Sequence, residues 1–229
     1  MNTNNKTARM AGFLYLIYMV TTIIANASRT KLIVFGDAIA TANNILASEW
    51  LFRIGFMSDV LAGVLFLLAA WALYVLLKPV NEDLALLFLI LNLGGVAVQS
   101  FSMLNLFAGL LLSGGADYLK AFPADQLQAL ALLFVNIYKN GFLLAQIFYG
   151  AWLLPLGYLV YKSGFLPKIL GILLILDFIA VLFWFLQVFL FPGYDFLHYP
   201  GVAVSFIAEV GLALWLLIMG AKETQDDPN

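Results

Sequence analysis

The sequence predicts an all-α membrane protein, a polytopic bundle of six transmembrane helices. Of its 229 residues, 64% are hydrophobic and only 10% are charged, whereas a soluble domain carries roughly 25% charged residues. The hydrophobic residues gather in runs of about 20 residues or more, the length that a helix needs to cross the hydrocarbon core. Membrane strands need only about 9–11 residues, and lipid offers no hydrogen-bond partner to an open backbone, so each run predicts a helix.

Six runs are separated by glycine, proline and charged residues. The expected spans are residues 8–27, 49–77, 84–113, 127–161, 169–191 and 201–220, in a single transmembrane domain over 1–229. The first run follows a basic start, as in a signal peptide, but its length of about 20 residues predicts a retained span. The fourth run is longer than a bilayer requires, so it should tilt, kink near Pro155 or extend beyond the membrane.

The distribution of lysine and arginine predicts the orientation. With the N-terminus inside, the inner segments hold Lys6, Arg9, Lys78, Lys162, Lys168 and Lys222, and the outer segments hold Arg29, Lys31 and Lys120. Because positive residues are enriched on the cytoplasmic side, this excess predicts that both termini are cytoplasmic.

The longest connection is the first outer one, residues 28–48. Asp37 is expected to cap a short helix over 38–47. Trp50, at the start of the second span, suits the aromatic belt at a membrane interface. The segment is interpreted as a lid or spacer over the bundle, with a gate as the less favoured alternative.

Five ionisable residues lie within the apolar runs: Arg53, Asp59, Lys139, Asp177 and Glu209. Each is costly in hydrocarbon and must face a protein interior or a wet cavity. The last four lie roughly 12 to 18 Å from a span end, which predicts one layer near the middle of the bilayer. Lys139 is the expected partner of Asp59, with Glu209 competing for it.

Arg53 has a nearer partner. Glu49 precedes it by one helical turn on the same face, in the favourable order, so these two should pair near the outer interface. In the layer itself, one lysine faces three acids. Burial and like charge both favour the neutral carboxyl, so we expect at least one of Asp59, Asp177 and Glu209 to be protonated at pH 7.

These residues support two interpretations. The first is a ligand or proton site, whose candidate residues are Asp59, Lys139, Glu209, Asp177, Arg53, Glu49, Gln99, Asn105 and Asn136. The second is a purely structural network, because buried polar groups also specify how helices pair. Gly150 and Gly157 are seven residues apart and predict a close-packed helix seam rather than a hinge.

Several kinds of chemistry lack their residues. The chain has no cysteine, and His198 is its one histidine, which excludes thiolate clusters and bis-histidine haem. There is no H-E-x-x-H motif and no P-loop. We therefore expect no metal and no cofactor, and the net charge of -2 argues against a nucleic-acid partner. The expected partner is the lipid bilayer.

Four segments resemble one known family. They are KTARMAG at residues 6–12, ASEWLFRIG at 47–55 with Asp59 beyond it, GYLVYKSGFLPKILG at 157–171, and AEVGLALWLL at 208–217. The chain is similar over nearly its whole length to the DUF4386 family of bacterial multi-pass membrane proteins. The resemblance implies a six-helix unit in the bacterial cytoplasmic (inner) membrane, and it assigns no catalytic residue.

The expected function is to bind or translocate a small solute or a proton at the central polar site. The alternative is a structural or regulatory membrane subunit whose buried charges only specify helix packing. An intramembrane enzyme with paired carboxylates as acid and base is the least favoured class, because no nucleophile, metal set or cofactor motif is recognisable.

Overall fold

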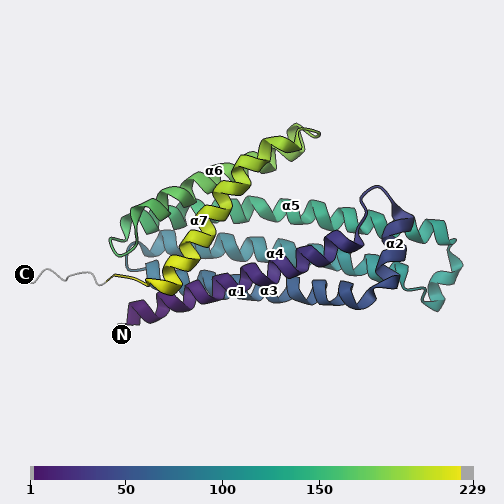
Figure 1. Cartoon of the computed structure of the whole chain (residues 1–229), viewed down its shortest axis with the longest axis horizontal. Helices are drawn as coiled ribbons and strands as arrows, with labels where there is room; N and C mark the ends of the chain where they lie inside the picture. The colour runs from purple at the N-terminus through teal and green to yellow at the C-terminus, as the bar shows by residue number, and fades with distance from the viewer. Residues whose placement is uncertain (1–2, 223–229) are drawn as a thin grey trace, which may run out of the picture. The chain divides into compact units, whose positions relative to one another are not determined.

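The computed structural model describes residues 3–222, and its regular elements in this part are helices. In chain order they are α1 (Thr3–Leu32), α2 (Ala38–Ala47), α3 (Glu49–Leu77), α4 (Glu82–Ser113), η1 (Asp117–Ala121), α5 (Ala124–Lys162), α6 (Lys168–Leu190), η2 (Asp195–His198) and α7 (Tyr199–Ile218), of which η1 and η2 are 3-10 helices (Figure 1). Within the described residues, six helices are long and apolar enough to cross a membrane. The prediction of six helices is confirmed, and the chain is a multi-pass integral membrane protein.

α1 and α5 exceed the spans expected from the sequence by the most residues. α1 continues past Ala27 to Leu32, because the next helix-breaking residue is Gly36, whose φ is +87°. Arg29, expected in the first outer connection, is therefore a helical residue. α5 has 39 residues and continues through Pro155. At 1.5 Å per residue it is roughly 58 Å long, well beyond the hydrocarbon thickness of about 30 Å.

The chain divides into two compact units. Unit 1 takes the residues up to Ile17, Leu65–Val96 and the chain from Leu144 onward, and unit 2 takes Tyr18–Val64 and Ala97–Leu143. All four boundaries fall inside helices, so α1, α3, α4 and α5 each contribute residues to both units.

In unit 1, α6 and α7 pack against each other (Figure 1). α5 and α6 also approach closely, because a Cβ added to Gly157 would lie only 2.8 Å from the carbonyl oxygen of Gly171. The predicted packing seam is confirmed at this position. The tight turn between the two helices uses Gly164, with φ +72°, and Ser163, whose Oγ accepts a hydrogen bond of 3.2 Å from the Leu166 amide.

In unit 2, α2 is held firmly against its neighbours. Asp37 caps it as expected, accepting a 2.8 Å hydrogen bond from the Ala40 amide. Thr41 bonds through its hydroxyl to both the amide and the carbonyl of Val34. Ile45 is fully buried in the same apolar cluster as Phe52 of α3. These contacts favour the spacer interpretation of this segment over the gate.

Candidate functional site

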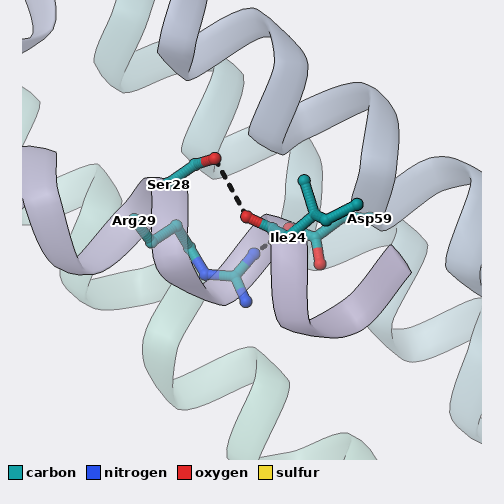
Figure 2. Close-up of polar contacts among 4 residues, drawn as sticks. All are labelled: Ile24, Ser28, Arg29 and Asp59. Carbon is teal, nitrogen blue, oxygen red and sulfur yellow. Dashed lines mark hydrogen bonds and ion pairs between the residues drawn. The ribbon is translucent and has the colours of Figure 1, made fainter. Parts of the chain in front are cut away.

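The site lies in unit 2 and depends on a close approach of α1 to α3. Gly55 makes it possible, because a Cβ there would lie 2.7 Å from the Cβ of Ser28. The Ser28 hydroxyl is already satisfied within α1, where it donates a 2.9 Å hydrogen bond to the carbonyl of Ile24 (Figure 2). Asp59 lies one turn beyond Gly55 on the same face of α3. The approach therefore brings its carboxylate to the α1 residue after Ser28.

That residue is Arg29, and its guanidinium forms an ion pair with Asp59 (Figure 2). The contact runs from Nη1 of Arg29 to Oδ2 of Asp59. The side chain of Asp59 is 3% exposed and that of Arg29 17% exposed, so the pair is largely shielded from solvent. Tyr138 of α5 completes the group, with the Arg29 guanidinium 5.7 Å from the centre of its ring.

Next to this pair is a cavity of about 410 Å³ between α1 and α5. This volume falls in the range typical of small-molecule sites. The lining residues are Thr22, Ile23, Asn26, Arg29, Thr30, Ile33, Phe35, Val135, Tyr138, Lys139 and Phe142. The walls are mainly apolar, and the two charged residues among them, Arg29 and Lys139, are both cations.

Lys139 has a different partner from the one expected. Its Nζ lies 4.4 Å from the centre of the Phe35 ring, and both residues line the cavity. Within residues 3–222 it forms no ion pair with a carboxylate. The expected pairing of Lys139 with Asp59 is therefore wrong, because Arg29 takes that carboxylate.

The outer pair is confirmed. Nη2 of Arg53 lies 2.6 Å from Oε1 of Glu49, and Nε donates a 2.8 Å hydrogen bond to the same oxygen. Both side chains are about half exposed, at 51% and 48%. The two charges satisfy each other within one turn of α3 and do not line the cavity.

The other two acids lie in unit 1 and have hydroxyl partners. Ser205 of α7 donates a hydrogen bond to Asp177 of α6. Tyr15 of α1 donates one of 2.6 Å to Glu209 of α7. Neither acid forms a salt bridge within the described part of the chain. Within the described contacts, Glu209 does not compete for Lys139. The single layer of Asp59, Lys139, Asp177 and Glu209 stays a prediction, because these residues belong to different units.

The remaining candidates lie apart from the cavity lining. Gln99, Asn105 and Asn136 belong to unit 2 and are half-buried. None of the three lines the cavity. The backbone carbonyl of Asn136 accepts a 2.9 Å hydrogen bond from the Asn140 side chain, a contact within α5.

Sequence reasoning missed three residues of the site: Arg29, Phe35 and Tyr138. A first span that ends at Ala27 places Arg29 in a loop. The signal that finds it is the lack of any glycine or proline between Ala27 and Gly36. The other two are aromatic residues among many, and nothing in their local sequence separates them from core or lipid-facing positions.

Comparison with known proteins gives one family and a distant relative. A family model described as "Domain of unknown function (DUF4386)" matches residues 10–220. A protein of Archaeoglobus fulgidus described as an uncharacterized protein is 30% identical over 158 residues, which cover 67% of this chain and 75% of the relative. No solved structure matches.

Proposed function

The chain belongs to the DUF4386 family, and from the geometry of its cavity we propose that it binds a small solute within the membrane. The site is the unit 2 cavity between α1 and α5, with Arg29 and Lys139 as the groups that recognise the solute. The class of function is the one expected from the sequence, but the proposed site is the cavity beside Arg29 and Lys139. Lys139 remains a binding residue, whereas Asp59 becomes the group that holds Arg29 in place.

The observation that carries the proposal is the charge of the cavity wall. Two cations line it, and among residues 3–222 only Arg29 finds a carboxylate partner. A charged side chain within a membrane region is costly unless it faces a wet cavity or a compensating group. The ring of Phe35 compensates Lys139 only partly, because a cation–π contact is worth about 0.5–2 kcal/mol.

The membrane setting is part of the proposal. We place the chain in the bacterial cytoplasmic membrane with both ends in the cytoplasm, which the excess of lysine and arginine on that side supports. Contacts within unit 1 support a shared side for the two ends. Nη2 of Arg9, near the start of α1, lies 3.4 Å from the carbonyl oxygen of Ile218, at the end of α7.

Filling the cavity tests the proposal. Asn26 is an exposed residue that lines it, and its neighbour Ala27 is exposed but outside the lining. The purified protein, Asn26→Phe and Ala27→Phe are screened by thermal shift against a library of metabolites. A bound ligand at a hundred times its Kd stabilises the protein by about 2.7 kcal/mol, enough to shift Tm clearly.

We expect a ligand that stabilises the natural protein and Ala27→Phe but not Asn26→Phe. The proposal is overturned if no ligand stabilises the natural protein. It is also overturned if every stabilising ligand raises the Tm of Asn26→Phe by the same amount.

A second candidate function, proton binding, is favoured by unit 1. In the part of the chain that the structure describes, Asp177 and Glu209 have hydroxyl partners and form no ion pair with a cation. Buried polar atoms without a hydrogen-bond partner also lie in this unit, among them Oδ2 of Asp177 and both side-chain atoms of Asn92. A network that served only helix pairing would be expected to satisfy such atoms. A carboxyl that meets a hydroxyl donor and no cation is suited to hold and release a proton.

The structural alternative is favoured by one observation, the internal pairing of Arg29 with Asp59. Under that alternative the charges of unit 2 serve only to join α1 to α3. It predicts that no ligand depends on Asn26 or Lys139, so the same screen separates it from solute binding.

A further inference from the structure

The chemical class of the solute follows from three features of the cavity, taken in turn: its charge, its walls and its position along α1. The inference rests on the proposed function and adds to it the nature of the ligand.

The charge of the cavity favours an anion. Arg29 contacts Asp59 through Nη1, and a guanidinium has further N–H donors in a planar fork. Such a fork suits two oxygens of a carboxylate or phosphate. Lys139 lines the cavity from the opposite helix, α5, and adds an ammonium donor. Asp59 neutralises Arg29, so the cavity wall has a net charge of one positive unit, which Lys139 carries.

The walls favour a ligand with an apolar part. Ile23 and Ile33 lie six residues before and four residues after Arg29. Phe142 and Val135 lie three residues after and four residues before Lys139 on α5, so apolar residues line the cavity on both sides of the two cations. A small hydrated anion would exchange its water for hydrocarbon walls on most sides, which is costly without further donors. A molecule with an oxyanion at one end and a hydrocarbon chain at the other matches both parts of the lining.

The position of the cavity suits such a molecule. Its lining runs from Thr22, inside α1, to Phe35, in the connection after α1 ends. It therefore extends from the body of a membrane span to its end, where headgroups and water meet. Phe35 is exposed at that end.

We propose that the cavity binds a single-chain amphiphile with an oxyanion headgroup, a carboxylate or a phosphate, held between Arg29 and Lys139. The hydrocarbon chain contributes little to selectivity, because lipid tails offer it an environment as apolar as the protein. The headgroup therefore decides which lipid binds. Loss of one charge-assisted hydrogen bond is expected to weaken binding about ten- to a hundred-fold.

Native mass spectrometry of the full chain in an uncharged detergent tests this inference. The probes share one chain length: myristate, myristoyl lysophosphatidate and the uncharged monomyristoylglycerol. Acetate and inorganic phosphate test whether the headgroup binds without a tail. Lys139→Gln removes the cavity charge. Lys120→Gln is the matched control, because Lys120 is exposed and pairs with exposed Asp117 in η1.

We expect myristate or lysophosphatidate to bind at least ten-fold more tightly than monomyristoylglycerol. Lys139→Gln should abolish that preference, and Lys120→Gln should keep it. The assignment is overturned if charged and uncharged probes bind equally, or if Lys139→Gln leaves the preference unchanged. It is also overturned if acetate or phosphate binds as tightly as the probes with a tail. If none of these probes binds while another ligand passes the Asn26→Phe screen, the ligand class is wrong and solute binding stands. If neither experiment finds a ligand, both proposals fall.

Discussion

The guanidinium of Arg29 pairs with the carboxylate of Asp59 and thereby links α1 to α3 inside unit 2. The link depends on a glycine, because any larger residue at Gly55 would press on Ser28 and separate the two helices. It also explains how an arginine in the last turn of a membrane helix is tolerated. The carboxylate compensates its charge, and the rest of the guanidinium faces the Tyr138 ring and the cavity.

Removal of one member of this pair should be strongly destabilising. In Asp59→Asn the cation keeps its shielded position and loses its carboxylate, which for buried pairs costs about 3–5 kcal/mol. We expect a clear loss in the free energy of unfolding, measured by denaturant titration in mixed micelles. The double variant Arg29→Met/Asp59→Leu should recover most of it, since an apolar pair replaces both charges.

The exposed pair gives the matched control. Glu49→Gln breaks the contact with Arg53 on the surface of the same helix, where such pairs are worth about 0–1 kcal/mol. A loss for Asp59→Asn no larger than that for Glu49→Gln would contradict the role assigned to the Arg29–Asp59 pair.

The α5–α6 seam should not accept a methyl group. In Gly157→Ala the new Cβ would lie 2.8 Å from a backbone oxygen of Gly171, so one helix must move, at a cost of about 1–3 kcal/mol. Gly211→Ala is the comparison, because its nearest neighbour would be an ordinary 3.7 Å contact with Leu170. There the gain in helix propensity should leave stability unchanged or slightly higher. Equal Tm values for the two variants would argue against close packing at Gly157.

The cap of α2 should matter locally. Asp37→Ala removes the acceptor of the Ala40 amide and should cost about 1 kcal/mol, whereas Asp37→Ser keeps an acceptor. Hydrogen exchange of the α2 amides is the measurement. Faster exchange in Asp37→Ala than in Asp37→Ser is expected within residues 38–47, with little change in α3. Equal exchange rates of the α2 amides in the natural protein, Asp37→Ala and Asp37→Ser would show that the tertiary contacts of Thr41 and Ile45 hold α2 without its cap.

Infrared difference spectroscopy at a series of pH values tests whether the buried carboxyl groups are protonated. We expect at least one of Asp59, Asp177 and Glu209 to show the carbonyl band of a protonated acid at pH 7, because burial disfavours the charged form. Asp59→Asn, Asp177→Asn and Glu209→Gln identify the source of the band. Tyr15→Phe should shift the band if Glu209 produces it, since Tyr15 donates to that carboxyl. Spectra in which all three acids are ionised would remove the proton-binding candidate.

Local signals predicted a large part of this molecule. Hydropathy and length identified six membrane helices, since a span is specified by its own residues. Spacing identified the Glu49–Arg53 pair and the Asp37 cap, because both join residues within one turn. Gly157 was recognisable as a packing position, although its partner Gly171 was not.

The partners of the buried charges could not be predicted in the same way. Asp59 was matched to Lys139 by depth along two helices, whereas the closest cation lies on α1 because Gly55 lets α3 approach there. Depth follows from counting residues at a fixed rise, but the direction a side chain faces depends on how each helix is rotated against its neighbours. The sequence by itself determined which helices form and which of their residues carry charge. Only the tertiary structure decided that Arg29 and Asp59 meet while Lys139 faces a cavity, because helix rotation and close approach are properties of packed pairs and not of single segments.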